Sequence, residues 1–267
     1  MKLVTIDIDG TLIRDDLSIS QQTVKAIKKV MDKEILVALC TGRPHVAAEH
    51  FAKMLGIEGF QISHNGAYIK HNISKETILH DTLPKGVAED INTMCRRDPR
   101  LCLSLLYGDC CYYERYDDFA MHVNIDVNFV TPIRVKDINE LVAQEEKNPT
   151  KILITGEERP LDEFMAALKK LYDSQVNILK SGPRYLDVIN KKSSKGRALK
   201  ILSAKLGIDR DEIMAIGDNF NDMDMLEFAG IGVAMGNAPE EVKKMADFVA
   251  PTNNEDGVAY ALQKLLS

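Results

Sequence analysis

The sequence predicts an α/β protein in which a parallel sheet is interrupted by an inserted α+β domain. Strand and helix patterns alternate at short intervals from residue 1 to about residue 82, and the same alternation returns after about residue 187. Such short β–α–β spacing is typical of a parallel sheet. We therefore expect residues 1–82 and 187–267 to form one core domain. Residues 83–186 have a different pattern and are expected to form a smaller α+β cap domain over it.

The first outer segment reads as three strands and two helices. Short apolar runs predict buried strands, and apolar residues at helical spacing predict amphipathic helices. The expected elements, in chain order, are the strand Leu3–Ile8, the helix Ser20–Lys33, the strand Ile35–Cys40, the helix Pro44–Leu55 and the strand Phe60–Ser63.

The inserted segment mixes hairpin-like runs with helical patterns. Two strand-like runs flank the turn residues Gly108 and Asp109, which predicts a β-hairpin. The expected strands are Leu101–Tyr107, Cys111–Tyr116, Lys151–Ile154 and Tyr185–Ile189, and the expected helices are Lys85–Arg96 and Leu161–Tyr172.

The second outer segment resumes the alternation of helix and strand and should complete the sheet begun by the first. The expected elements are the helix Lys195–Leu206, the strand Ile213–Gly217, the helix Asn219–Phe228, the strand Gly230–Val233, the helix Pro239–Lys244, the strand Phe248–Ala250 and a closing helix that ends at Leu266.

The bulk composition narrows the class of protein. A net charge of −6 and the absence of a long Lys/Arg run argue against a nucleic-acid or membrane-surface binder. No apolar stretch reaches the roughly 18 residues that span a bilayer, and the N-terminus lacks a signal-peptide pattern, so we expect a cytoplasmic protein. The five cysteines form no C-x-x-C pair and begin no C-x5-R loop, which argues against a zinc knuckle and against cysteine-based phosphatase chemistry. No obligate protein partner is evident.

Two carboxylates stand at the carboxyl end of the first predicted strand. Asp7 and Asp9 stand two residues apart and Gly10 comes next, which predicts a strand whose carboxyl end opens into a tight turn. Ligands of open α/β sheets bind at that end of the strands. Once the chain turns at Gly10, both acids can converge on one point outside the sheet. The alternative is a pair of turn-forming aspartates that cap a helix.

Thr41, Gly42 and Arg43 follow the predicted strand Ile35–Cys40. They offer a hydroxyl, a glycine amide and the start of the helix at Pro44, which together can hold a phosphate oxygen. The alternative for Thr41 is a plain helix cap.

Charged residues also mark two positions in the second outer segment. Lys195 opens a helix, where a cation opposes the helix dipole, so an anion is expected to share its site; the alternative is a solvated lysine. Asp218 and Asp222 follow the strand Ile213–Gly217; the alternatives are that Asp218 caps the next helix and that Asp222 is a solvated acid in its first turn. If they meet Asp7 and Asp9 at one sheet edge, a cation must relieve their repulsion, and all-oxygen ligands favour Mg2+.

These runs together resemble a known family. D-I-D-G-T-L from Asp7, T-G-R from Thr41, S-K-G around Lys195 and G-D-N-F-N-D-M from Gly217 are similar to the motifs of the haloacid dehalogenase superfamily of aspartate-nucleophile phosphatases. Their order, with a large insertion between the second and third motifs, resembles the Cof-type hydrolases with an α/β cap. Nearly the whole chain is covered, including Asn65-Gly66-Ala67 and residues 253–258. The lead into Lys195, residues 190–193, departs from the family's proline- and glycine-containing pattern.

The resemblance implies a Rossmann-like core and a role for several residues. Asp7 would take the phosphoryl group, and Asp9 would protonate the leaving oxygen and then activate water. Thr41 and Lys195 would bind phosphate oxygens, with Asn221 near the phosphate. Lys195 would also neutralise Asp7.

The resemblance also implies the metal site and the substrate-facing residues. Mg2+ would be held by Asp7, the backbone carbonyl of Asp9 and Asp218, with Asp222 steadying them. The other residues expected at the phosphate or substrate are Gly42, Arg43, Asn65 and Gly66, although Arg43, Asn65 and Gly66 could equally be structural.

Three functions are compatible with these residues. The first is a Mg2+-dependent phosphatase acting on a small phosphorylated metabolite, such as a sugar phosphate or a phosphorylated cofactor, through an aspartyl-phosphate intermediate. The second is a phosphomutase that returns the phosphoryl group to a sugar. The third is a non-catalytic phospho-aspartate receiver, against which Asp9 argues, because a receiver needs no general acid.

Overall fold

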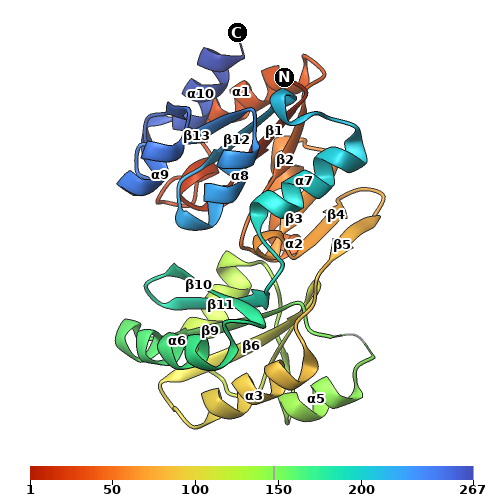
Figure 1. The fold of residues 1–267 in the computed structure, drawn as a ribbon, viewed down its shortest axis with the longest axis vertical. Helices are drawn as coiled ribbons and strands as arrows, with labels where there is room; N and C mark the ends of the chain where they lie inside the picture. The colour runs from red at the N-terminus through yellow and green to blue at the C-terminus, as the bar shows by residue number, and fades with distance from the viewer. Residues whose placement is uncertain (147, 267) are drawn as a thin grey trace. The chain divides into compact units, whose positions relative to one another are not determined.

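The computed structural model describes residues 1–146 and 148–266, which divide into two compact units (Figure 1). The first unit comprises residues 1–41 and 48–79 and the described chain from Ser194 onward. The second comprises residues 42–47 and 80–193. Each unit has hydrophobic clusters of its own. The chain therefore leaves the first unit and later returns to it.

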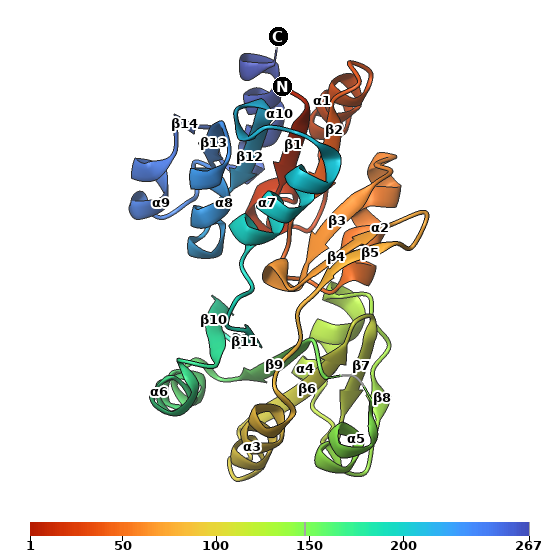
Figure 2. The ribbon, with the colours of Figure 1, turned by 45° about the vertical axis from the view of Figure 1, so that its right-hand side comes forward.

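The first unit is built on a five-stranded parallel sheet in the order β14-β13-β12-β1-β2 (Figure 2). The central strand β1 pairs with β2 from the same outer segment and with β12 from the other. The prediction that both segments share one parallel sheet is thus confirmed. The strands are β1 (Leu3–Ile6), β2 (Leu36–Leu39), β12 (Ile213–Gly217), β13 (Ile231–Ala234) and β14 (Phe248–Val249).

Helices cover both faces of this sheet, because alternate strand residues point to opposite sides. Val4 and Ile6 of β1 share a hydrophobic cluster with α1, α2 and α10, whereas Leu3 shares one with α7, α8 and α9. The helices are α1 (Gln21–Met31), α2 (His45–Leu55), α7 (Lys195–Leu206), α8 (Met223–Phe228), α9 (Glu240–Met245) and α10 (Gly257–Leu265).

The strand β3 (Phe60–Ser63) has the predicted bounds but different partners. It pairs antiparallel with β4 (Tyr68–His71), and β5 (Thr77–His80) completes a three-stranded sheet. One parallel bridge, between Cys40 and Ile62, joins it to the end of β2. The expectation of a further parallel strand is therefore wrong beyond that bridge.

The second unit contains a six-stranded, mostly antiparallel sheet in the order β10-β11-β9-β6-β7-β8. Its core lies between this sheet and α3, α5 and α6. The predicted hairpin around Gly108 is present as β6 and β7. The elements are α3 (Lys85–Arg96), β6 (Leu101–Tyr107), β7 (Cys110–Tyr113), α4 (Asp118–His122), β8 (Ile133–Arg134), α5 (Ile138–Gln144), β9 (Lys151–Gly156), α6 (Glu158–Tyr172), β10 (Val176–Gly182) and β11 (Tyr185–Asn190).

Short helical turns connect several of these elements and carry residues discussed below. In the first unit they are η1 (Ile8–Leu12), η2 (His64–Gly66), η4 (Arg210–Glu212), η5 (Phe220–Asp222) and η6 (Asn253–Glu255), and in the second unit η3 (Val123–Val127). Within the described residues, every helix is too short or too polar to cross a lipid bilayer.

Candidate active site

Asp7 leaves the carboxyl end of β1 at the centre of the parallel sheet. Its backbone N–H donates to the Ile216 carbonyl at 2.9 Å, and its side chain is buried. The chain then turns through η1, where Gly10 has a left-handed φ of +72°. A Cβ at Gly10 would lie 2.4 Å from Asp218 Oδ2, so both the backbone conformation and the close approach require glycine.

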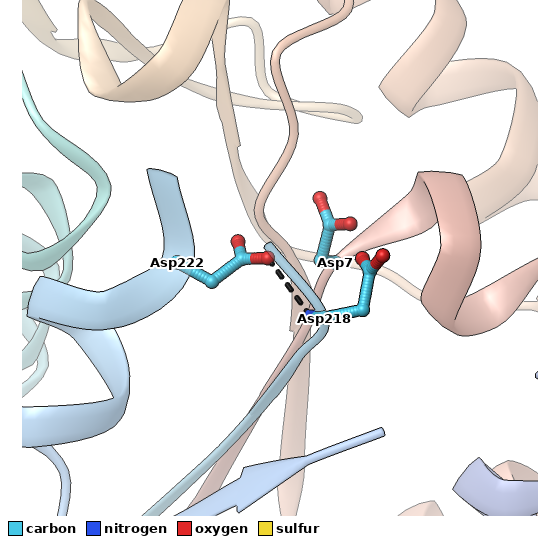
Figure 3. A group of neighbouring side chains, drawn as sticks. All are labelled: Asp7, Asp218 and Asp222. Carbon is cyan, nitrogen blue, oxygen red and sulfur yellow. Dashed lines mark hydrogen bonds between the residues drawn. The ribbon is translucent and has the colours of Figure 1, made fainter. Parts of the chain in front are cut away.

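Three carboxylates converge at this edge of the sheet (Figure 3). Asp7, Asp218 and Asp222 each offer an oxygen, and these oxygens lie within 4.8 Å of one another. Asp222 is fully buried, and its Oδ2 accepts the backbone N–H groups of Asp218 at 3.0 Å and Asn219 at 2.9 Å. Asp222 is therefore not a solvated acid, and it fixes the loop that carries Asp218.

The side chain of Asp9 is not one of these three closely spaced carboxylates, although its charge acts on Asp7 and Asp218. Asp9 is exposed, whereas Asp7 is buried. The closest set of carboxylates therefore joins Asp7 to the acids that follow β12, and Asp9 is not a member of it. The implied role of Asp9 as a metal ligand involves only its backbone carbonyl and does not require its carboxylate in the group.

Lys195 is the first residue of α7 and is only 1% exposed. Its Nζ lies 2.5 Å from Asp7 Oδ1 and 2.5 Å from Asp222 Oδ1. The alternative of a solvated lysine is therefore wrong. The side chain joins the ends of β1 and η5, which are far apart in the sequence.

The electrostatics of the group follow from burial and like charge. Burial, followed by the charge of Asp222, raises the pKa of Asp7 well above its usual range, although Lys195 opposes the shift. The same two causes raise the pKa of Asp218 to about 7. Burial would lower the pKa of Lys195, but the carboxylates of Asp222 and Asp7 outweigh it and keep the ammonium charged.

The ammonium of Lys195 contacts two of the three carboxylates, and its single positive charge does not balance them, so the group favours an additional cation. The three side chains supply only hard oxygen donors, which suit Mg2+ rather than a softer metal. The residues present therefore fit the divalent cation that the sequence led us to expect.

Two residues that the sequence analysis missed hold Asp218. Thr11 Oγ1 donates to Asp218 Oδ1 at 3.0 Å. The side-chain amide of Asn237 donates to the Gly10 carbonyl at 2.9 Å and to Asp218 Oδ2 at 3.4 Å. A signal was present for both: Thr11 belongs to the same run as Asp9 and Gly10, and Asn237 follows the carboxyl end of β13, at the ligand-binding edge of the sheet.

Four predicted binding residues lie in the first unit beside this group. Thr41 is buried after β2, and its carbonyl accepts the Asn65 N–H at 3.0 Å. Asn65 Oδ1 accepts the Asn221 amide at 2.9 Å. A Cβ at Gly66 would lie 2.1 Å from the Ser194 carbonyl oxygen. Gly66 thus packs against the residue that precedes Lys195.

The other two, Gly42 and Arg43, belong to the second unit. The Arg43 guanidinium donates to the Val127 carbonyl. The Gly42 carbonyl accepts from Lys151 Nζ at 3.0 Å, and Lys151 forms a buried ion pair with Asp187 at 2.6 Å. These hydrogen bonds connect parts of the second unit, and the role of Gly42 and Arg43 in binding stays a prediction.

Comparisons with known proteins agree on one family. The model of the haloacid dehalogenase-like hydrolases matches residues 4–262. Phosphatase YwpJ of Bacillus subtilis is 33% identical, and the alignment covers 100% of both chains. The 5-amino-6-(5-phospho-D-ribitylamino)uracil phosphatase YitU of the same organism is 28% identical over 99% of this chain and 97% of the relative. The crystal structure of a haloacid dehalogenase-like hydrolase from Bacteroides thetaiotaomicron matches with a TM-score of 0.89 and 31% identity over 99% of each chain.

Proposed function

The chain belongs to the haloacid dehalogenase-like hydrolases and is a phosphoric monoester hydrolase, and we propose that it uses Mg2+ and an aspartyl-phosphate on Asp7 to dephosphorylate a small metabolite. One observation carries this proposal. The buried carboxylate of Asp7 lies 2.5 Å from the Lys195 ammonium and shares a compact site with Asp218 and Asp222.

Asp7 would attack the phosphorus atom while the bond between phosphorus and the leaving oxygen breaks. The carboxylate must be ionised to do so, and the charge of Lys195 favours that form. Bound Mg2+, held by Asp7, Asp218 and the Asp9 carbonyl with Asp222 in support, would neutralise the charge of the phosphate. Lys195 and Thr41 would bind the phosphate oxygens.

Asp9 would act as the general acid and then as the general base. It would first give its proton to the leaving oxygen, so that the product departs as an alcohol. Its carboxylate would then take a proton from water, and that water would attack the phosphorus of the aspartyl-phosphate. Inorganic phosphate would leave and Asp7 would be regenerated. The exposure of the Asp9 side chain suits a group that must meet both substrate and water.

The second unit is proposed to select the substrate. The residues assigned to chemistry lie in the first unit, and the second unit is a separate domain with its own sheet. A relative named for a phosphorylated ribitylamino-uracil supports a phosphorylated metabolite of small size as the substrate class.

Purified protein assayed with a panel of phosphorylated sugars and phosphorylated cofactors tests the proposal. We expect phosphate release that requires Mg2+ and is abolished by EDTA. Asp7→Asn should release none, and wild-type protein quenched in acid during turnover should carry a phosphoryl group that Asp7→Asn lacks. Turnover by Asp7→Asn at the wild-type rate, or turnover undiminished in EDTA, would overturn the proposal.

A further inference from the structure

Asn237 links three loops beside the acidic group. It lies in the loop after β13 and is exposed, yet its side chain is hydrogen-bonded on both sides. The amide nitrogen donates to the Gly10 carbonyl at 2.9 Å and to Asp218 Oδ2 at 3.4 Å. The amide oxygen accepts the backbone N–H of Asn253 at 3.0 Å. An exposed asparagine held in this way differs from one that only faces solvent.

Asn253 determines which end of the Asn237 amide faces the site. A backbone N–H can only donate, so the oxygen of Asn237 must point toward Asn253 and the NH2 group toward Gly10 and Asp218. Asn253 itself is buried, and its amide donates to the Ile13 carbonyl and to Asp15 Oδ1, both at 3.0 Å. The loop after Asp9 and the orientation of Asn237 are therefore fixed by the same residue.

Both carboxylate oxygens of Asp218 receive a donor from a different loop. Thr11 donates to Oδ1 at 3.0 Å, and Asn237 donates to Oδ2 at 3.4 Å. Two donors on opposite oxygens restrict rotation of the carboxylate about its terminal bond. The bond from Asn237 to the Gly10 carbonyl also holds the turn that carries Asp9.

We propose that Asn237 is a positioning residue that orients Asp218 and the Asp9–Gly10 turn for the divalent cation, with Asn253 fixing the orientation of its amide. This inference rests on the proposed function, because it takes Asp218 to be a metal ligand. A residue that orients a ligand changes metal affinity, whereas a residue that merely joins loops changes stability alone.

The test compares Asn237→Ala with Asn254→Ala. Asn254 is also exposed and also contacts the loop after Asp9, because its side chain bonds the backbone N–H and the carboxylate of Asp15 at 3.2 and 2.8 Å. Among the described residues, its side-chain hydrogen bonds go to Asp15 and not to Asp218 or Gly10. It therefore reports what the loss of a loop contact does by itself.

Mg2+ is titrated against the Tm of each EDTA-treated protein, and kcat and KM are measured with an activated aryl phosphate. We expect Asn237→Ala to weaken Mg2+ binding about tenfold or more, as is typical when a group that orients a metal ligand is lost. Its kcat at saturating substrate and limiting Mg2+ should fall and recover when Mg2+ is raised. Asn254→Ala should keep the wild-type Mg2+ affinity.

Equal Mg2+ affinity in wild type and Asn237→Ala would overturn the inference, and so would an equal loss in both variants. Failure of the proposed function looks different. In that case the Tm of the wild type itself would not respond to Mg2+, or Asp218→Ala would respond as wild type does.

Discussion

At the scale of single residues, the acidic group carries more negative charge than its surroundings neutralise. Burial and the neighbouring Asp222 raise the pKa of both Asp7 and Asp218, while Lys195 is the cation that faces Asp7 and Asp222. Moving charges from water to a protein interior costs free energy that one ion pair does not fully recover. The metal-free protein should therefore hold protons in this group at neutral pH, and a divalent cation should compete with them.

Because the pKa of Asp218 is raised in the folded protein, the stability of the protein should depend on pH. Its pKa is about 7 in the folded protein and about 4 in an unfolded chain. The folded state thus binds this proton more tightly, and the stabilisation is lost as the pH rises from about 4 to about 7. In EDTA, as the pH rises from about 4 to about 7, we expect the Tm of wild type to fall relative to that of Asp218→Asn. Thermal unfolding at a series of pH values measures the difference, and a difference independent of pH would contradict the prediction.

Substitution of the exposed Asp9 should lower the turnover rate without lowering the stability of the protein. Asp9→Asn removes the proposed acid and base but keeps the backbone carbonyl, so turnover should fall by about 10²–10⁴. The Tm and its response to Mg2+ should match those of wild type, because the side chain is exposed and lies outside the acidic group. The control is Asp16→Asn, which changes another exposed acid in the loop after Asp9 and should keep full activity. Turnover of Asp9→Asn within a few-fold of wild type would remove Asp9 from the mechanism.

At the scale of elements, the position of Lys195 depends on how α7 begins. The Ser194 side chain accepts the Arg197 N–H at 3.2 Å, which caps the helix. Gly66 in η2 packs against the Ser194 carbonyl, and no larger residue fits there. From the sequence, Gly66 is expected at the phosphate or substrate, with a structural role as the alternative. The structure shows a contact through which it positions the start of α7.

A comparison of Gly66→Ala with Gly207→Ala distinguishes two effects, which are strain in the backbone and displacement of Lys195. Both glycines have positive φ, +88° and +65°, so backbone strain alone should cost either alanine about 1 kcal/mol of stability, and the steric overlap at Gly66 should add to that cost. Gly207 ends α7 with nothing within 4 Å of its added Cβ, whereas the Cβ at Gly66 would lie 2.1 Å from the Ser194 oxygen. A shift of about 1 Å in a catalytic group can cost 10²-fold in rate.

We therefore expect kcat to fall by about that factor in Gly66→Ala and to stay near wild type in Gly207→Ala. Steady-state kinetics at saturating Mg2+, together with the Tm of each variant, provide the measurement. Equal kcat values for the two variants would show that Gly66 does not position Lys195.

Elements with local start and stop signals were predictable from the sequence. The helix Lys195–Leu206 has its predicted bounds, because Ser194 caps one end and Gly207 adopts a left-handed conformation at the other. The strands β4, β5 and β10 were missed. Their runs mix apolar with polar residues, as in Tyr68–His71, and their stability comes from partners that local periodicity does not identify. The antiparallel pairing of β3 with β4 was missed for the same reason.

In the candidate site, too, residues with a local sequence signal were predicted, and contacts that depend on distant loops were not. Asp7, Thr41 and Asp218 were found because each stands at the carboxyl end of a predicted strand, and such residues are expected to lie together at one edge of a parallel sheet. The contacts of Arg43 within the second unit and the contact of Asn237 with Asp218 were not found. Both depend on how distant loops pack, and no spacing in the sequence encodes that packing.

At the scale of the whole molecule, the chain separates into two units with different contents. The first unit holds the acidic group, Lys195 and two hydrophobic clusters that cover both faces of its sheet. The second unit holds a different sheet with its own main cluster. Because hydrophobic burial is the main stabilising term in folding, each cluster should support its own unit.

Replacing residues 80–193 with a short glycine-rich linker tests this separation. Ile78 and Leu79 pack against the same cluster as Leu199 and Leu202 of α7, so both ends of the deletion belong to one packed region. The shortened core should fold, and Mg2+ should stabilise it by about 2.7 kcal/mol at a hundredfold excess over the dissociation constant. Asp218→Ala in the shortened core should remove most of that gain.

The shortened core should also lose its choice of substrate while keeping some chemistry. The groups proposed to attack phosphorus and move the proton remain, so slow Mg2+-dependent cleavage of an activated aryl phosphate should persist. If the second unit selects the substrate as proposed, its removal takes away the side chains that would exclude water and contact the leaving group of a natural metabolite. The kcat/KM values of the shortened core for different phosphorylated metabolites should therefore differ less than those of the intact protein. A folded core with the ranking and efficiency of the intact protein would show that the second unit does not select the substrate, and a folded core without a Mg2+ response would show that the metal site requires it.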